Sequence, residues 1–251
     1  MEDILQLAKE KFKEIILEKE LYYQDVIVTA RGLSAQEAIG NPERKDFPIL
    51  QGKEVMIEAE FSGSFGQAFT DSPGEFAGKL SDVMNFSLNG SGNRGLLVAV
   101  MNSVLKYLGL AKGTVHCKDQ EPEECSKDLI KWMDDKVEND WKIGLIGLQP
   151  SMLENLTQHY GSNRILASDL NPQNIGKVKF GVTILDGNMD NYEIIDKAQF
   201  VLLTGSSIIN NTFSELYEKL VTENKKFVVF GNTISGIASL VHIPHICFYG
   251  R

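Results

Sequence analysis

The chain has 251 residues, of which 43% are hydrophobic and 24% charged, as in an ordinary globular protein of one large or two modest domains. Its formal net charge of −9 argues against nonspecific binding to nucleic acid or to anionic membranes, because both depend on clustered Lys and Arg. No apolar run approaches the roughly 18 residues that span a bilayer, and the acidic start lacks the basic and apolar parts of a signal peptide. We expect a cytoplasmic protein that binds neither nucleic acid nor membrane.

The cysteines support the same compartment. Cys117, Cys125 and Cys247 are an odd set without CxxC spacing, which is typical of free thiols in a reducing environment. His116 and the histidines near Cys247 are further metal-ligand types, but the tight, repeated spacing of a zinc site is missing. We therefore assign no metal ligands from the sequence.

The first half of the chain mixes helical and strand patterns. Ile4, Ala8 and Phe12 recur at helical spacing among charged residues. Val55 and Ile57 alternate with charged neighbours, as in a half-buried strand. We expect, in chain order, a helix over 2–20, a strand over 22–30, an irregular excursion over 32–52, a strand over 53–61, a glycine-containing loop over 63–78 and a helix over 94–108.

The second half alternates helices and strands, which predicts an α/β fold with a mainly parallel sheet and helices on both faces. A helix begins at Glu121, where Pro122 and acidic residues suit the first turn. We place the domain boundary near residue 118. The expected elements are helices over 121–137, 151–160, 210–222 and 235–241, and strands over 142–147, 164–168, 182–185, 199–204, 226–231 and 246–249.

Three of these apolar strands run directly into loops of small polar residues. The loops contain Gly147, Gly205 and Gly231. In an open parallel sheet such loops meet at the carboxyl ends of the strands, where small molecules bind. Glycine lets a ligand approach the backbone closely, and free N–H groups at helix starts attract anions. The pattern predicts a ligand site.

The first of these loops is unsuited to a dinucleotide. The stretch from Gly144 lacks the full GxGxxG spacing, and Gln149-Pro150 occupies the place where a pyrophosphate needs close backbone contact. This disfavours a nicotinamide or flavin dinucleotide, and no cofactor is identified. The alternative interpretation is a simple glycine turn in which Ser151 caps the next helix.

Asp169 follows the strand expected over 164–168, about 20 residues beyond the first glycine turn. Rossmann-like proteins place at this position the carboxylate that accepts hydrogen bonds from ribose hydroxyls. The alternative is a structural one, in which Asp169 and Asn171-Pro172 form a polar turn. Both interpretations stay open.

The loop after the strand at 199–204 has more hydrogen-bonding residues than one helix cap needs. It contains Thr204, Ser206, Ser207, Asn210, Asn211 and Thr212. Because a cap takes a single such residue, the surplus favours ligand contact. Asn232 and Thr233 repeat the pattern one strand later. The chain has no Ser/His/Asp signature, GxSxG elbow, P-loop or HExxH helix, so it is undecided whether it is an enzyme.

Five segments that span most of the chain match a known family in order and spacing. They are residues 66–71, 94–102, 146–150, 203–212 and 230–233. On these segments the chain resembles a prokaryotic family named for heavy-metal chelation. The resemblance implies an enolase N-terminal-like α+β domain over 1–118, followed by a Rossmann-like domain over 119–251 that is similar to that of methyltransferases. It also implies a cleft shared by the two domains.

The resemblance extends to individual residues. It implies ligand-binding roles for Gly66, Thr70, Arg94, Asn102, Thr204, Gly205, Asn210, Thr212, Gly231 and Thr233. The chain departs from the family after the last of the three strands, where many relatives have Gly-Pro and this chain has Gly231-Asn232. Arg94 and Asn102 have an alternative interpretation, as a helix-start charge and as a buried amide that bonds to the backbone.

The leading hypothesis is a cleft that binds a small polar or anionic metabolite, such as a metal chelator or its complex. An enzymatic version adds condensation, hydrolysis or group transfer on that compound. S-adenosylmethionine chemistry is another alternative, since Asp169 could hold the ribose. Direct metal binding ranks last, because it requires the cysteines and histidines to converge. A homodimer is consistent with the resemblance, since both kinds of domain form dimers readily.

Overall fold

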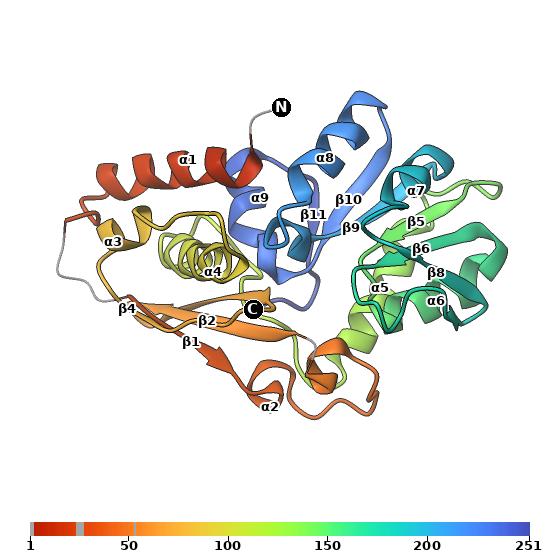
Figure 1. Cartoon of the computed structure of the whole chain (residues 1–251), viewed down its shortest axis with the longest axis horizontal. Coiled ribbons are helices and arrows are strands. Elements are labelled where there is room, and N and C mark those ends of the chain that lie inside the picture. Colours follow the sequence, from red (N-terminus) through yellow and green to blue (C-terminus); the bar gives the residue numbers. More distant parts are fainter. Residues whose placement is uncertain (1–2, 24–27, 53) are drawn as a thin grey trace.

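The computed structural model describes residues 3–23, 28–52 and 54–251 and contains two sheets, each with its own helices (Figure 1). The first sheet has four antiparallel strands in the order β3-β2-β1-β4. Its strands are β1 (Val28–Leu33), β2 (Val55–Phe61), β3 (Ser64–Thr70) and β4 (Phe76–Gly78). The helices of this half are α1 (Ile4–Glu18), α2 (Ala35–Ile39), α3 (Leu80–Met84) and α4 (Ser91–Tyr107), with a 3₁₀ turn η1 (Pro48–Gln51).

Helix α4 is the centre of the first half. Its residues from Arg94 to Leu105 are all buried, because the helix packs against β2 and β3 on one side and against the second half on the other. A helix that is apolar on every side is stable only when it is enclosed in this way.

The second sheet has the strand order β11-β10-β9-β5-β6-β8-β7. All neighbouring strands are parallel except β7 and β8. Numbered along the chain, the six parallel strands follow the 3-2-1-4-5-6 order of a doubly wound sheet. The strands are β5 (Ile143–Ile146), β6 (Ile165–Asp169), β7 (Val178–Lys179), β8 (Val182–Asp186), β9 (Phe200–Thr204), β10 (Lys226–Phe230) and β11 (His245–Ile246).

Helices cover both faces of this sheet, which confirms the predicted α/β class. Along β9, Val201 and Leu203 point into one core cluster, whereas Phe200 and Leu202 point into the other. Helices α5 (Glu121–Met133) and α6 (Pro150–Tyr160) cover the second of these faces. Helices α7 (Asn191–Lys197), α8 (Phe213–Thr222) and α9 (Ser235–Val241) cover the first.

The two halves share a core. The cluster beneath α7, α8 and α9 continues through α1 and α4 of the first half, so this one core cluster contains apolar side chains from both halves. Helix α1 packs against α8 and α9, and β3 packs against the turn that follows β10. The two halves are therefore held against each other by apolar packing. The domain boundary near residue 118 and the likeness to an enolase N-terminal domain stay predictions.

Several predicted elements differ from the observed ones. The stretch 63–78 was expected to be a loop but contains β3 and β4. Its small and polar residues hid the strand pattern, since β3 is held by pairing with β2 and by packing on α4. The strand expected over 22–30 begins at Val28, and residues 24–27 lie outside the described part. The strand expected over 246–249 is reduced to β11, and α7 was not predicted.

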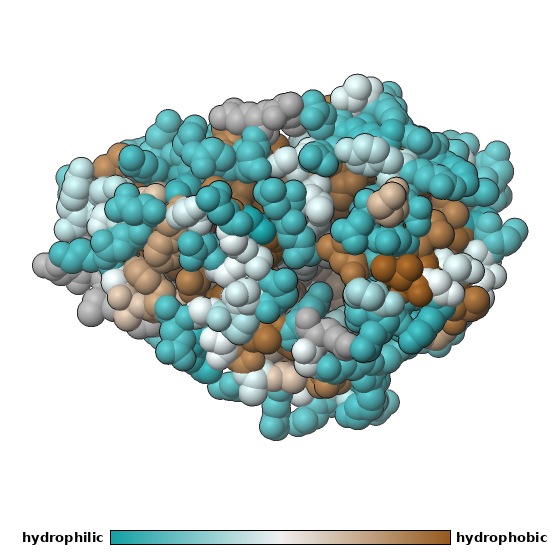
Figure 2. Space-filling view, viewed as in Figure 1, coloured by the Kyte–Doolittle hydropathy of each residue, from teal (hydrophilic) through white to brown (hydrophobic). Residues whose placement is uncertain are grey.

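The surface seen in Figure 2 is mainly hydrophilic, with apolar residues in separate patches. Among the described residues, no helix combines the length and the apolar character needed to cross a membrane.

Candidate functional site

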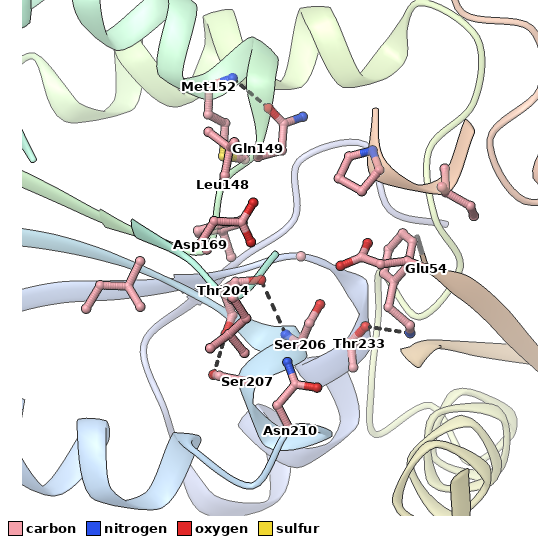
Figure 3. Close-up of a pocket in the computed structure, with 18 of the residues that line it drawn as sticks. Glu54, Leu148, Gln149, Met152, Asp169, Thr204, Ser206, Ser207, Asn210 and Thr233 are labelled. Atoms are coloured by element: carbon pink, nitrogen blue, oxygen red, sulfur yellow. Dashed lines mark hydrogen bonds between the residues drawn. The ribbon is translucent and has the colours of Figure 1, made fainter. Parts of the chain in front are cut away.

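A cavity of about 500 Å³ lies between the two halves of the molecule (Figure 3). Its walls combine the carboxyl ends of β5, β6, β9 and β10 with the end of β3 and the residue before β2. The volume is in the range of sites for small molecules and cofactors. The predicted gathering of loops at the carboxyl ends of the parallel strands is therefore observed, and the first half closes the other side.

The loop after β9 brings five polar residues to the cavity. They are Thr204, Ser206, Ser207, Asn210 and Thr212. Thr204 Oγ1 accepts a hydrogen bond from Ser206 N at 3.4 Å, which starts the 3₁₀ turn η3 (Gly205–Ile208). Ser207 Oγ donates to Thr204 O at 2.6 Å. These two bonds set the loop conformation and use only part of its hydrogen-bonding capacity.

Gly147 is required where β5 ends. Its φ is +92°, and a Cβ at this position would lie 2.3 Å from Thr204 Cγ2. Only glycine lets this loop pass so close to the loop after β9. The next helix, α6, is capped by Gln149, whose Oε1 accepts from Met152 N at 2.6 Å, rather than by Ser151 as the sequence suggested.

Asp169 lies in the polar turn of its structural interpretation, and its ribose-binding interpretation stays a prediction. Its Oδ1 accepts from Asn171 N at 3.1 Å and its Oδ2 from Asn174 Nδ2 at 2.5 Å, so it organises the turn after β6. The same carboxylate lines the cavity and points into it (Figure 3). The turn therefore holds the carboxylate in one orientation towards the open space.

Glu54 faces Asp169 from the opposite wall and was missed at the sequence level (Figure 3). Burial, together with the negative charge of Asp169, raises the pKa of Glu54 to about 7. In the sequence this residue is only a charged neighbour in an alternating strand pattern. Nothing local distinguishes it from the exposed Glu60 on the same strand.

Thr233 and Asn232 connect the cavity to the first half. Thr233 Oγ1 accepts from Phe69 N of β3 at 3.1 Å. Asn232 is fully buried, and its Nδ2 donates towards Gln67 O at 3.4 Å and Thr114 O at 3.5 Å. Both residues line the cavity, as do the predicted Thr70 and Gly231.

Arg94 and Asn102 were candidate ligand residues, but the structure places neither in the cavity wall. Arg94 donates from Nε to Ile209 O at 2.6 Å and from Nη1 to a carbonyl of its own half. Asn102 donates from Nδ2 to Gln67 O at 2.9 Å and to Thr233 O at 3.0 Å, and its Oδ1 accepts from Gly236 N at 2.8 Å. Asn102 matches its alternative interpretation as a buried amide that bonds to the backbone. Arg94 also bonds to backbone carbonyls, which its alternative interpretation as a helix-start charge did not include.

Gly66 and Gly205 also lie outside the cavity wall, and each allows a close approach. A Cβ on Gly66 would lie 2.1 Å from Ser103 N of α4. A Cβ on Gly205 would lie 2.8 Å from Ile234 Cγ2. These glycines act in packing, next to the site rather than in it.

All three cysteines line the cavity, although they are far apart in the sequence. Burial raises the pKa of each thiol, that of Cys247 to about 12, so the thiols are protonated at neutral pH. Burial lowers the pKa of the neighbouring His116 to about 4. Among the described residues, no group of three or more His, Cys, Asp or Glu side chains is placed to hold a metal ion.

Comparisons with known proteins agree with this fold. Residues 129–243 match the model of the DUF364 family, described as "Putative heavy-metal chelation". No curated protein matches. The crystal structure of a protein with unknown function from the DUF364 family of Pyrococcus horikoshii superposes with a TM-score of 0.51 at 17% identity, covering 92% of this chain and 79% of that one.

A second DUF364 protein with unknown function, from Desulfitobacterium hafniense DCB-2, has a TM-score of 0.49 at 12% identity, with coverages of 74% and 72%. The family match includes Asp169 and the loop after β9 but not Glu54. The second half of the chain is therefore similar to the DUF364 family, and the Pyrococcus horikoshii structure shares the fold of the whole molecule.

Proposed function

We propose that this protein binds a small polar metabolite in the cavity between its halves, and that metal chelators or their complexes are the class of compound concerned. One observation carries the proposal. The polar loops after β5, β6, β9 and β10 all open into one cavity of about 500 Å³. Such a cavity, with a few convergent polar groups, is the usual form of a small-molecule site.

The walls suit a ligand with a polar edge and an apolar body. Thr204, Ser206 and Asn210 offer hydroxyl and amide groups along one side. Apolar side chains complete the enclosure: Phe47, Ile49, Phe69, Leu148, Met152, Phe230 and Ile246. Polar groups of this kind fix the orientation of a ligand, whereas the apolar surface supplies most of the binding free energy.

The family description supports a connection with metals, but the side chains do not fit direct chelation. Among the described residues, no three potential ligands converge with the spacing of a metal site. We therefore infer that a metal enters this cavity as part of the bound compound.

Acid–base catalysis on the bound compound is a second candidate function. The observation that favours it is Glu54, whose pKa of about 7 suits proton transfer at neutral pH. S-adenosylmethionine is less well supported, because the glycine turn after β5 lacks the GxGxxG spacing. Catalysis is tested by turnover of the retained compound, which we expect to be lost in Glu54→Gln.

The binding proposal is tested by native mass spectrometry of the full chain purified without chelators or added cofactors. We expect an organic mass on the wild type that is lost in Thr204→Val and in Asp169→Asn. Thr222→Val is the matched control, since Thr222 is exposed and distant from the cavity wall. If both cavity variants keep the compound with unchanged affinity, the proposal is wrong. A bare metal ion, lost when the three cysteines are replaced by serine, would instead establish direct metal binding.

A further inference from the structure

The cavity is acidic on two opposing sides. Glu54 directly precedes β2 and Asp169 ends β6, and their carboxyl groups point towards the same space in Figure 3. Asp71 is the third acidic residue of the wall. Among the described residues that line the cavity there is no Lys or Arg, and the buried His116 is neutral at pH 7 because its pKa is lowered to about 4.

The two facing carboxylates retain capacity for a ligand. Asp169 accepts one hydrogen bond at each oxygen, and a carboxylate oxygen can accept two. Among the residues that the structure describes, none donates a hydrogen bond to the carboxyl group of Glu54. Burial makes such a carboxylate costly unless a donor or a positive charge approaches it.

Asn232 of the cavity wall carries a buried acceptor without a partner among the described residues. Its Nδ2 faces the two carbonyl oxygens of Gln67 and Thr114, which fixes the orientation of the amide. Its Oδ1 is then a buried acceptor with no partner among the described residues, in a side chain of the cavity wall. A buried acceptor without a donor is uncommon.

We propose that the cavity selects compounds with a protonated nitrogen group, such as an amidine, an amine or a protonated heterocycle, which lies between the carboxylates of Glu54 and Asp169. The inference rests on the proposed binding function and names its ligand class. It also reverses one part of the sequence hypothesis, since an anionic metabolite would meet acidic walls without a compensating Lys or Arg among the described lining residues.

The test uses three probes of similar shape and different charge: benzamidine, benzamide and benzoate. Their affinities for the full chain are measured by ligand-observed NMR at pH 8 and fixed ionic strength, where Glu54 is mostly ionised. A hydrogen bond to a charged group contributes about 1.5–3 kcal/mol. We therefore expect benzamidine to bind at least about tenfold more tightly than benzamide, and benzoate to bind most weakly.

Two cavity variants and one control locate the effect. Glu54→Gln and Asp169→Asn should each weaken benzamidine binding about tenfold and change benzamide binding less than about twofold. Glu60→Gln, on the exposed side of β2, should change neither.

The inference is overturned if benzamidine has no advantage over benzamide, including the case in which no probe binds, or if its advantage survives in both cavity variants. Displacement of benzamidine by millimolar Mg²⁺ in the wild type but not in Glu54→Gln would assign the carboxylates to a metal ion instead. Benzamide binding that depends on Thr204 but shows no preference for charge would leave the proposed function intact while this inference fails.

Discussion

The two walls of the cavity are built in different ways. The wall from the second half consists of loops that directly follow buried parallel strands, and its polar groups are mostly neutral. The wall from the first half consists of residues that lie near one another only because β2, β3 and α4 pack against the second half. It contributes Glu54, His116, Phe47 and Phe69. The residues of the second-half wall are therefore positioned by the local strand and loop pattern, whereas those of the first-half wall are positioned by tertiary packing.

A substitution at the junction of the two halves should give the largest loss of stability. Asn102 bonds to Gln67, Thr233 and Gly236, so Asn102→Ala removes hydrogen bonds from buried backbone groups of both halves. We expect a loss of about 3 kcal/mol or more in the free energy of unfolding, measured in urea. Asn89→Ala, at an exposed position, is the control and should change stability by less than about 0.5 kcal/mol. A loss below 1 kcal/mol in Asn102→Ala would contradict the role of this residue at the junction.

A substitution in the loop after β5 tests the local geometry of the second-half wall. Gly147→Ala combines a φ of +92° with a Cβ placed 2.3 Å from Thr204 Cγ2, so we expect a loss of about 2–3 kcal/mol and of bound metabolite. Gly176→Ala separates backbone strain from steric contact, because Gly176 has a φ of +75° but no atom of a described, non-adjacent residue lies within 4 Å of the place of its Cβ. Equal losses of stability in the two variants would show that the contact with Thr204 has no effect.

The wall from the first half should respond to pH through Glu54. Its folded pKa of about 7 is above the ordinary value of 4.5, so the folded state binds this proton more tightly than the unfolded state does. The stability contributed by protonation is present at low pH and is lost as the pH rises through 7. Glu54→Gln should therefore be more stable than the wild type by about 1–3 kcal/mol at pH 8 and nearly equal to it at pH 4.

Thermal unfolding at both pH values measures this difference. Glu60→Gln should follow the wild-type pH profile, because its carboxylate is exposed. A stability gain in Glu54→Gln that is the same at pH 4 and pH 8 would be inconsistent with a titrating buried carboxylate.

A smaller loss of stability is expected from Arg44, which links the segment 32–52 of the first half to the second half by ion pairs. Arg44 pairs with Glu123 of α5 and Glu154 of α6. Because the three side chains are mostly buried, Arg44→Ala should cost about 1–2 kcal/mol, and less at high salt. Arg31→Ala removes an exposed pair with Glu37 and should leave the free energy of unfolding nearly unchanged in the same urea series. Equal costs would mean that Arg44 does not hold the two halves together.

The sequence by itself determined the α/β class, the sheet of the second half and the gathering of Gly147, Asp169, Thr204 and Thr233 around one site. These follow from short-range patterns, since an apolar strand, a polar loop and a helix repeat along the chain, and parallel strands bring their carboxyl ends to one edge. Site residues could therefore be predicted from the sequence where they directly follow a strand of the parallel sheet.

Only the tertiary structure decided the rest. It placed Glu54 opposite Asp169, brought three distant cysteines to one cavity, and assigned Arg94 and Asn102 to internal hydrogen bonds. It also turned the polar stretch after Gly63 into the strand β3, because pairing with β2 and contact with α4 outweigh its weak local preference. The physical reason is the same in each case: burial and pairing depend on segments that are far apart in the sequence, and no local pattern records which segments will meet.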